Sequence, residues 1–300
     1  MISGFYFITR QIKTKTKDMS NEYTEKDFKL FEEINKNGRV DPFEKVEYPP
    51  VAISMGETMM GGKSFPIPLG TYGNFSFVYG PPKTRKTFLI SLMSSVYLND
   101  KVTFGGAMRG HREGKGLLHI DTEQGKFHAA KVFRRPFDIS GKDNFDNYHT
   151  FALRQYSFEQ RLQFIDYYLY NIAENLGVCI IDGIADLVSD VNDINQSNIC
   201  VQYLMKWTQE LNIHIITVIH SNFGSDKPSG HLGSFLEKKA ETQILLEQNT
   251  KHENMVTVSC KRSRGFPFEK FSFSVNEYSL PQVVGDLYDP LEGMNIVKVV

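Results

Sequence analysis

The residues from Phe75 to Ile90 read Phe-Ser-Phe-Val-Tyr-Gly-Pro-Pro-Lys-Thr-Arg-Lys-Thr-Phe-Leu-Ile and could bind a polyphosphate. The first six alternate in the manner of a strand, and the apolar residues after Lys86-Thr87 are typical of a helix. A turn between a strand and a helix presents backbone N–H groups and the helix N-terminus to an anion. The spacing Gly80-x5-Lys86-Thr87 therefore predicts a phosphate-binding loop.

Two residues of this P-loop have distinct expected tasks. We expect Lys86 to contact the β- and γ-phosphates and the Thr87 hydroxyl to hold Mg²⁺. The other predicted nucleotide-binding residues are Gly80, Pro81, Pro82, Lys83, Thr84 and Arg85. Arg85 stands where the usual pattern has a second glycine. If the position requires a positive φ, the arginine costs about 1 kcal/mol, and its surroundings must hold it.

Three more polar side chains follow predicted strands. Asp182 ends the apolar run Val178–Ile181 and would orient Mg²⁺ through water as a Walker B carboxylate. Glu123 could orient an attacking water; its neighbour Asp121 competes for that role or caps the next helix. His220 could sense the γ-phosphate and pass its state to the following loop. The alternative for Asp182 and His220 is an ordinary solvated side chain at a strand end, and for Glu123 a first-turn glutamate that the helix dipole favours.

A basic cluster lies late in the chain. Lys261, Arg262 and Arg264 are predicted to lie in a turn between two strands. Such a turn can simply favour solubility, or it can stabilise phosphate charge in a neighbouring subunit. The residues alone leave both readings open.

The elements that position these side chains alternate between strand and helix up to about residue 220. Predicted strands are Leu117–Asp121, Tyr148–Leu153, Val178–Asp182 and Ile213–Ile219, then Thr242–Glu247, Met255–Cys260 and Phe271–Val275. Predicted helices span 87–98, about 124–134, 157–177 and 197–211. This order predicts an α/β fold with a mostly parallel central sheet, flanking helices and an antiparallel C-terminal edge. In such sheets ligands bind at the carboxyl ends of the strands.

The chain divides into three predicted parts. Residues 1–50 form an N-terminal extension with a helix near Glu25–Lys36, residues 51–280 the main domain, and residues 281–300 a tail. The stretch Val51–Tyr72 is rich in Gly and Pro and is predicted to be irregular. Residues 1–18 carry an apolar patch before basic residues, the wrong order for a secretory signal.

Composition excludes several classes of protein. Lys and Arg number 34 and Asp and Glu 35, so bulk charge argues neither for nor against nucleic-acid binding, and any basic surface must be local. The three cysteines, Cys179, Cys200 and Cys260, form no zinc or disulfide pattern and suit a reducing cytoplasm. No apolar run approaches the ~18 residues of a membrane span, so we expect no membrane partner.

The ordered motifs resemble the RecA-like P-loop ATPases, in particular the RepA/DnaB-type AAA-domain proteins of plasmids, phages and other mobile elements. The resemblance covers Gly73 to Val275 and rests on the P-loop, Asp-Thr-Glu-Gln, Ile-Ile-Asp-Gly, Val-Ile-His-Ser and Lys-Arg-Ser-Arg-Gly. It implies ATP and Mg²⁺ as cofactors. It assigns Glu123 as the water-activating glutamate, His220 as the sensor, and Lys261 and Arg264 as a basic finger acting in trans.

The resemblance also implies partners: a homo-oligomeric ring or filament with ATP at subunit interfaces, single-stranded DNA, and possible replication proteins. Loops 187–197 and 221–231 match the DNA-facing loops of that family. The first loop holds Asp190 and Asp193 and no basic residue, and the second offers Lys227 and His231. Because contacts with nucleic-acid phosphates normally need Lys or Arg, these loops depart from the family pattern.

The leading hypothesis is an ATP-hydrolysing motor or loader acting on DNA in replication, recombination or mobile-element maintenance. The alternative is a nucleotide-gated regulatory or assembly ATPase with weak hydrolysis and a protein partner. A small-molecule kinase is the third reading. Against it, no Arg-rich lid follows the strand that ends at Asp182.

Overall fold

The computed structural model describes residues 23–100, 104, 107–249 and 254–284, in two units that divide between Tyr48 and Pro49. Residues 1–18 and most of the predicted tail lie outside this range. In the first unit, α2 (Glu25–Asn37) begins with a capping box. The Thr24 hydroxyl accepts the Asp27 N–H, and the Asp27 carboxylate accepts the Thr24 N–H. The helix predicted there is confirmed.

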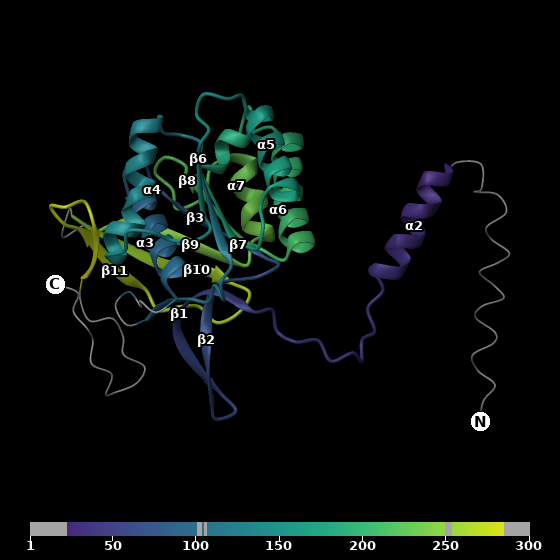
Figure 1. Ribbon diagram of the computed structural model, residues 1–300, viewed down its shortest axis with the longest axis horizontal. Coiled ribbons are helices and arrows are strands. Elements are labelled where there is room, and N and C mark those ends of the chain that lie inside the picture. The colour runs from purple at the N-terminus through teal and green to yellow at the C-terminus, as the bar shows by residue number, and fades with distance from the viewer. Residues whose placement is uncertain (1–22, 101–103, 105–106, 250–253, 285–300) are drawn as a thin grey trace. The chain divides into compact units, whose positions relative to one another are not determined.

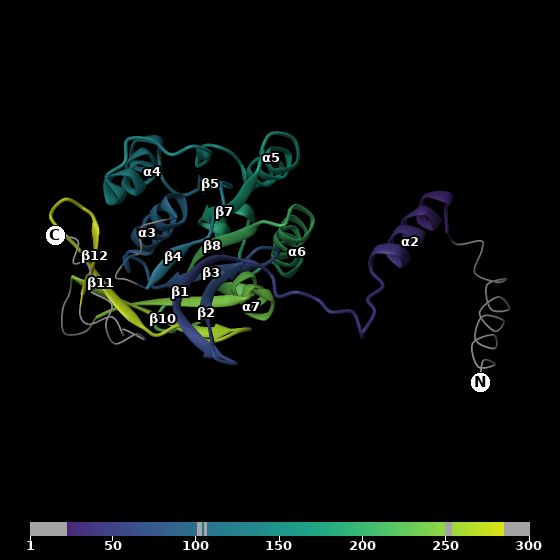
Figure 2. The ribbon, with the colours of Figure 1, turned by 60° about the horizontal axis from the view of Figure 1, so that its bottom comes forward.

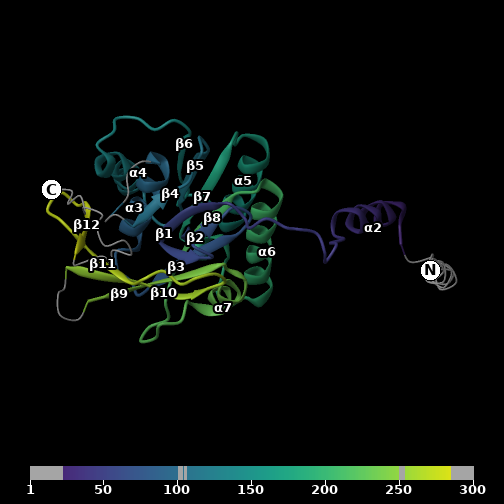
Figure 3. The same ribbon diagram turned by 90° about the horizontal axis from the view of Figure 1, so that it is seen from below.

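The second unit is built on a nine-stranded sheet (Figure 1). In sheet order the strands are β12 (Pro281–Val284), β11 (Phe271–Val275), β10 (Met255–Ser263), β9 (Thr242–Gln248), β3 (Phe75–Gly80), β8 (His214–His220), β7 (Leu176–Asp182), β5 (Gly116–Asp121) and β6 (Tyr148–Ala152). Neighbours from β6 to β9 pair in parallel, and β10, β11 and β12 continue the sheet antiparallel (Figure 3). The predicted α/β architecture is confirmed.

Helices cover both faces of the sheet. They are α3 (Lys86–Asn99), α4 (Lys126–Ser140), α5 (Phe158–Asn171), α6 (Ile194–Leu211) and α7 (Gly230–Lys239), with a 3₁₀ helix, η1 (Ile184–Leu187). Figure 1 shows α3 and α4 on one side and α5, α6 and α7 on the other. Two apolar cores fill the space between helices and sheet. None of the helices in the part of the chain that is described has the length and apolar character needed to cross a bilayer.

The local sequence explains the central elements. Residues Val178–Ile181 are fully buried, as expected for a parallel strand covered on both faces. Helix α3 is buried nearly all round because it packs between the sheet, α4 and the small sheet described next. Helix α5 begins with the predicted capping box, in which Ser157 and Gln160 bond each other's backbone N–H.

The stretch 51–72, predicted to be irregular, is instead a β-hairpin. Strands β1 (Val51–Met60) and β2 (Lys63–Thr71) join β4 (Met108–Gly110) in a second sheet beside α3 (Figure 2). Gly61 and Gly62, with φ of 56° and 77°, form a two-residue turn that requires positive φ at both positions. Pro66 and Pro68 are tolerated because β2 is an edge strand.

Four smaller expectations are also wrong. The segment Leu232–Lys239, predicted as a turn, belongs to α7. Helix α5 ends at Asn171 rather than near Gly177, which lies in β7. Residues 281–284, predicted to start a loose tail, form β12 and pair with β11. Strand β10 extends through Ser263, so Lys261 and Arg262 lie on a strand rather than in a turn.

One buried histidine gives the fold a pH dependence. His119, on β5, is fully buried, with Nδ1 3.2 Å from the Tyr148 hydroxyl and its ring edge-on to Phe133. Burial, with a smaller effect of the Arg135 charge, lowers the pKa of His119 from 6.5 to about 3. Below pH 6.5 the unfolded chain therefore binds a proton here that the folded chain does not, and stability is lost as the pH falls.

Between pH 6.5 and pH 4, His119 should lower the free energy of unfolding of the unaltered chain by about 3 kcal/mol. His119→Asn has no imidazole to protonate, so we expect this part of the fall to be absent from the variant. The measurement is the free energy of unfolding in urea across that pH range, compared with the unaltered chain. His128→Asn, at an exposed position on α4, is the matched control. Parallel pH profiles for His119→Asn and the unaltered chain would contradict the assignment.

Candidate functional site

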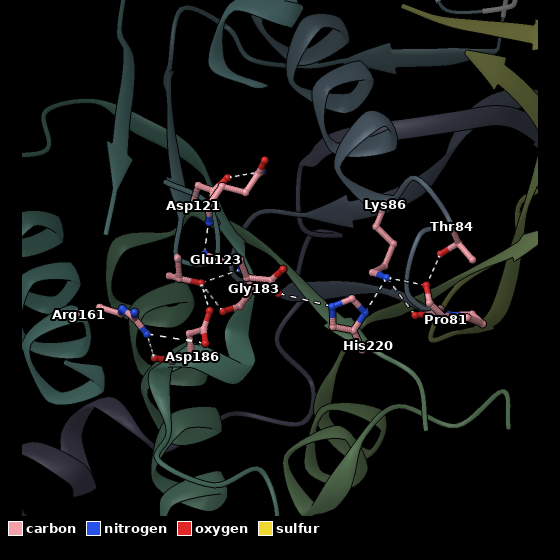
Figure 4. A network of polar contacts seen from close by, with 12 residues as sticks. Pro81, Thr84, Lys86, Asp121, Glu123, Arg161, Gly183, Asp186 and His220 are labelled. Carbon is pink, nitrogen blue, oxygen red and sulfur yellow. Dashed lines mark hydrogen bonds and ion pairs between the residues drawn. The ribbon is translucent and has the colours of Figure 1, made fainter. Parts of the chain in front are cut away.

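The register of the parallel ladder brings the predicted site residues to one edge of the sheet. Gly80 at the end of β3 pairs with His220 at the end of β8, and Asp121 of β5 pairs with Asp182 of β7. Helix α3 begins at Lys86, directly after the loop that leaves β3. Figure 4 shows Lys86, His220 and Glu123 facing one another across this edge.

The Lys86 ammonium is the central charge of the site. It donates to Gly80 O (3.0 Å) and Pro81 O (2.9 Å) and lies 3.0 Å from His220 Nδ1. The Thr84 hydroxyl also donates to Pro81 O, at 2.8 Å. Burial lowers the pKa of Lys86 to about 8, although the carboxylates of Glu123 and Asp182 oppose the shift. The loop carbonyls thus hold a buried cation that no carboxylate of the described residues contacts directly.

The position of Arg85 does require a positive φ: the residue adopts the left-handed conformation, with φ 61° and ψ 30°. Its side chain is partly exposed and contacts Asn254. The guanidinium donates to Asn254 O (2.9 Å) and Asn254 Oδ1 (3.2 Å), beside the start of β10. Contacts from a neighbouring hairpin therefore hold the residue that replaces the second glycine of the motif.

Asp182 and Thr87 offer oxygen atoms suited to a hard cation. Asp182 Oδ2 is buried and has no hydrogen-bond partner within the described chain. Burial, reinforced by Asp121 and Glu123, raises the pKa of Asp182 to about 7, while a hydrogen bond from Thr87 and the Lys86 charge oppose the rise. An unpartnered buried carboxylate oxygen next to a threonine hydroxyl fits Mg²⁺, which prefers oxygen ligands.

The protein alone would not enclose such an ion. Among the described residues, no three His, Cys, Asp or Glu side chains converge to hold a metal. Mg²⁺ usually keeps several waters and takes further ligands from bound phosphate. Thr87 and Asp182 therefore fit a metal site that a bound phosphate group would complete.

Glu123 lies beyond β5, with its side chain 43% exposed, and its Oε1 is 3.8 Å from His220 Nε2. Its polar contact with His220 is the main cause that lowers the pKa of Glu123, and the Lys86 charge acts in the same direction. Because the Lys86 ammonium can only donate, His220 Nδ1 accepts and Nε2 carries the proton that faces Glu123. Lys86, His220 and Glu123 thus form a continuous chain of polar contacts.

Asp121 was the other candidate to orient the attacking water, but both of its carboxylate oxygens accept hydrogen bonds from the protein. Its Oδ1 accepts the backbone N–H groups of Glu123 (3.0 Å) and Gln124 (2.7 Å), and its Oδ2 accepts from Gln124 Nε2 (2.7 Å). These bonds make Asp121 a structural carboxylate that supports the turn before α4. The exposed carboxylate of Glu123 is the one that can reach a ligand.

The structure does not bring Lys261 and Arg264 to this group. The Lys261 ammonium forms an ion pair with Asp226, and the Arg264 guanidinium donates to Lys239 O at 2.7 Å. Asp193, in the first loop predicted to face DNA, caps α6 by accepting the Gln196 N–H. The Lys261 and Asp193 side chains are thus engaged within the same chain.

Sequence reasoning missed a second group of residues around Glu123. Thr122 bonds the backbone of Gly183 and the carboxylate of Asp186, which in turn lies beside Arg161. Gly183 directly follows Asp182, and a built Cβ there would lie 2.4 Å from Glu123 Oε1. A glycine after the strand carboxylate was the available signal, but its meaning depends on a neighbour 60 residues away.

The left-handed backbone of Arg85 makes a testable prediction. Arg85→Ala removes the bonds to Asn254 and keeps the strained φ, whereas Arg85→Gly removes both the bonds and the strain. We expect the glycine variant to be more stable than the alanine variant by about 1 kcal/mol in urea unfolding. At Lys131, within α4, the same pair of variants should differ in the opposite direction. Equal stability of the two Arg85 variants would show that the position carries no strain.

No family model matches the sequence, and no curated protein matches it. Among solved structures, the chain is similar to the crystal structure of the RadB recombinase, with 17% sequence identity and a TM-score of 0.51. The match covers 71% of this chain and 92% of the RadB chain. At this identity the likeness shows the fold alone. The chain therefore has the RecA-like α/β fold that its sequence predicted.

Proposed function

We propose that this protein is a P-loop ATPase that hydrolyses ATP with Mg²⁺ in the cytoplasm, by a RecA-like mechanism. The observation that carries the proposal is the chain of contacts Lys86–His220–Glu123 at the carboxyl edge of the sheet. Beside it lies a carboxylate oxygen of Asp182 that has no hydrogen-bond partner in the described part of the chain. A polyphosphate, a metal and a water each find a complementary side chain there.

Each residue has one task in this mechanism. Lys86 exchanges its bonds to Gly80 O and Pro81 O for bonds to the β- and γ-phosphates. Thr87 and Asp182 would hold Mg²⁺, which when bound neutralises charge on the phosphate oxygens. The Glu123 carboxylate, whose lowered pKa keeps it ionised, orients a water for in-line attack. The residues thus supply positioning and charge stabilisation, the main terms in phosphoryl transfer.

His220 is placed to sense the nucleotide. It shares Lys86 with the loop carbonyls, so binding of a γ-phosphate at Lys86 changes the partner of Nδ1. The segment beyond His220 is tied to the same place, because Ser221 N donates to Gly80 O and Ser229 N donates to His220 O. Binding of a nucleotide at the P-loop can therefore change the contacts that hold residues 221–229.

The carboxylate and the lysine should fail in different ways. We expect Lys86→Ala to abolish turnover and weaken ATP binding, since the variant loses the phosphate-binding cation. Glu123→Gln should bind ATP normally and lower kcat by at least about 100-fold, as expected when a group that acts on the attacking water is lost. Phosphate release and binding of a fluorescent nucleotide are the two measurements.

The matched control is Glu174→Gln, at an exposed position before β7. Normal hydrolysis by Glu123→Gln would contradict the assignment of the water-orienting group. Undiminished binding and turnover in Lys86→Ala would contradict the nucleotide site itself.

We propose further that the ATPase acts as a homo-oligomer on DNA in replication, recombination or mobile-element maintenance, with single-stranded DNA and replication proteins as partners. The support is the fold shared with a protein named a recombinase and the order of the RepA/DnaB-type motifs. In this proposal Lys261 and Arg264 leave Asp226 and Lys239 and act on ATP bound by a neighbouring subunit.

A specific observation favours the second candidate, a nucleotide-gated assembly ATPase with a protein partner. In loop 187–197, the Asp190 and Asp193 carboxylates accept backbone N–H groups of the same segment. In the second loop, Asp226 forms an ion pair with Lys261. The first loop therefore offers no basic side chain to a nucleic-acid phosphate, and the second offers Lys227 and His231.

The ATPase rate with and without single-stranded DNA separates the two candidates. A DNA motor should hydrolyse ATP several-fold faster with DNA, and the gain should fall steeply between 50 and 200 mM salt, since phosphate contacts release counterions (losses of about 10³ or more in affinity are typical). An assembly ATPase should keep one rate and change its oligomeric mass with ATP. An ATPase rate that does not change with DNA, together with an oligomeric mass that does not change with ATP, would contradict both candidates.

A further inference from the structure

The segments that follow β5 and β7 are joined by the side chain of Thr122. The Thr122 N–H donates to Asp182 O at 2.8 Å, which extends the β5–β7 pairing by one residue. At the next step the Thr122 hydroxyl oxygen accepts the Gly183 N–H at 2.9 Å, in place of a backbone carbonyl. The Thr122 hydroxyl thus continues the ladder where the backbone of Glu123 turns away to bond Asp121.

Gly183 is the surface against which the Glu123 carboxylate lies. A Cβ built on Gly183 would stand 2.4 Å from Glu123 Oε1, well inside van der Waals contact, so the carboxylate occupies the space of the missing side chain. Gly183 has φ −123° and ψ 136°, and the atoms nearest to a built Cβ all belong to the Glu123 side chain. The position of the Gly183 backbone therefore sets where the carboxylate can lie.

Asp186 and Arg161 hold Thr122 in turn. The Thr122 hydroxyl lies 2.8 Å from Gly183 O and 3.0 Å from Asp186 Oδ2, either of which can accept its proton. The Arg161 guanidinium donates to Asp186 O, Leu153 O and Arg154 O, and its side chain is 12% exposed. It links η1 to the residues that follow β6, and Figure 4 shows this network beside Glu123.

The Glu123 side chain has few contacts of its own. It is 43% exposed, and its ion-pair distance to His220 is 3.8 Å, longer than a hydrogen bond. A carboxylate that orients a water must be held to within about 0.5 Å, and a displacement of 1 Å can cost about 100-fold in rate. Glu123 therefore needs support from its surroundings.

We propose that Thr122, supported by Asp186 and Arg161, is a positioning residue that fixes Gly183 and thereby the Glu123 carboxylate for attack on ATP. The inference rests on the proposed hydrolysis and deepens it. It gives the threonine of Asp-Thr-Glu a role distinct from those of the two carboxylates beside it.

The test compares Thr122→Val with Thr122→Ser. Valine keeps the branched shape but leaves the Gly183 N–H without an acceptor, whereas serine keeps the hydroxyl. We expect Thr122→Val to lower kcat at least about tenfold, with the affinity for a non-hydrolysable ATP analogue changed less than about twofold. Thr122→Ser should restore most of the rate. A purely structural role would instead lower stability, analogue binding and kcat together.

Two further variants keep the result open to contradiction. Gly183→Ala places a methyl group against the Glu123 carboxylate without changing the Thr122 hydroxyl, and it should lower kcat in the same way. In a Glu123→Gln background, Thr122→Val should cause no additional loss, since both changes act on one step. Additive losses, or a normal kcat in Thr122→Val, would overturn the positioning role. Absence of hydrolysis in the unaltered protein would instead overturn the proposed function and the inference with it.

Discussion

The parallel register of β3, β8, β7 and β5 is the constraint on which the site depends. Gly80 pairs with His220, and Asp121 pairs with Asp182, so residues 140 and 61 positions apart meet at one edge. Parallel neighbours require crossover connections, and helices α3 to α6 are these connections. A slip of one residue in β7 would turn Asp182 towards the opposite face of the sheet. Side chains of β7 and β8 pack into both cores, and such a slip would disrupt this packing on each face.

Burial then determines the electrostatics at this edge. The Lys86 ammonium and the Asp182 carboxyl are both largely withdrawn from water. Burial lowers the pKa of Lys86 and raises the pKa of Asp182, so it favours the neutral form of each group. The loop carbonyls compensate the lysine, while one oxygen of Asp182 has no hydrogen-bond partner among the described residues. Triphosphate and magnesium would complement both groups, so the charges that cost stability in the free protein are those that favour the ligand.

Much of the architecture follows from local patterns. The apolar run Val178–Ile181 predicted a buried parallel strand, and the Ser157–Gln160 pair predicted a helix start, because both signals depend on neighbours within a few residues. The failures have the same physical origin. The glycines and prolines of 51–72 are typical of loops, and they fit a strand only because β2 is an edge and Gly61-Gly62 form a tight turn.

For the site, the sequence by itself determined which residues could do chemistry: the P-loop spacing, and polar residues placed after apolar strands. Only the tertiary structure decided how they are held. Arg85 is secured by Asn254, Lys261 is paired with Asp226, and Thr122 bonds Gly183. These contacts join segments from 35 to 169 residues apart. No local propensity or periodicity encodes such contacts, because they exist only once the packed sheet and helices bring the segments together.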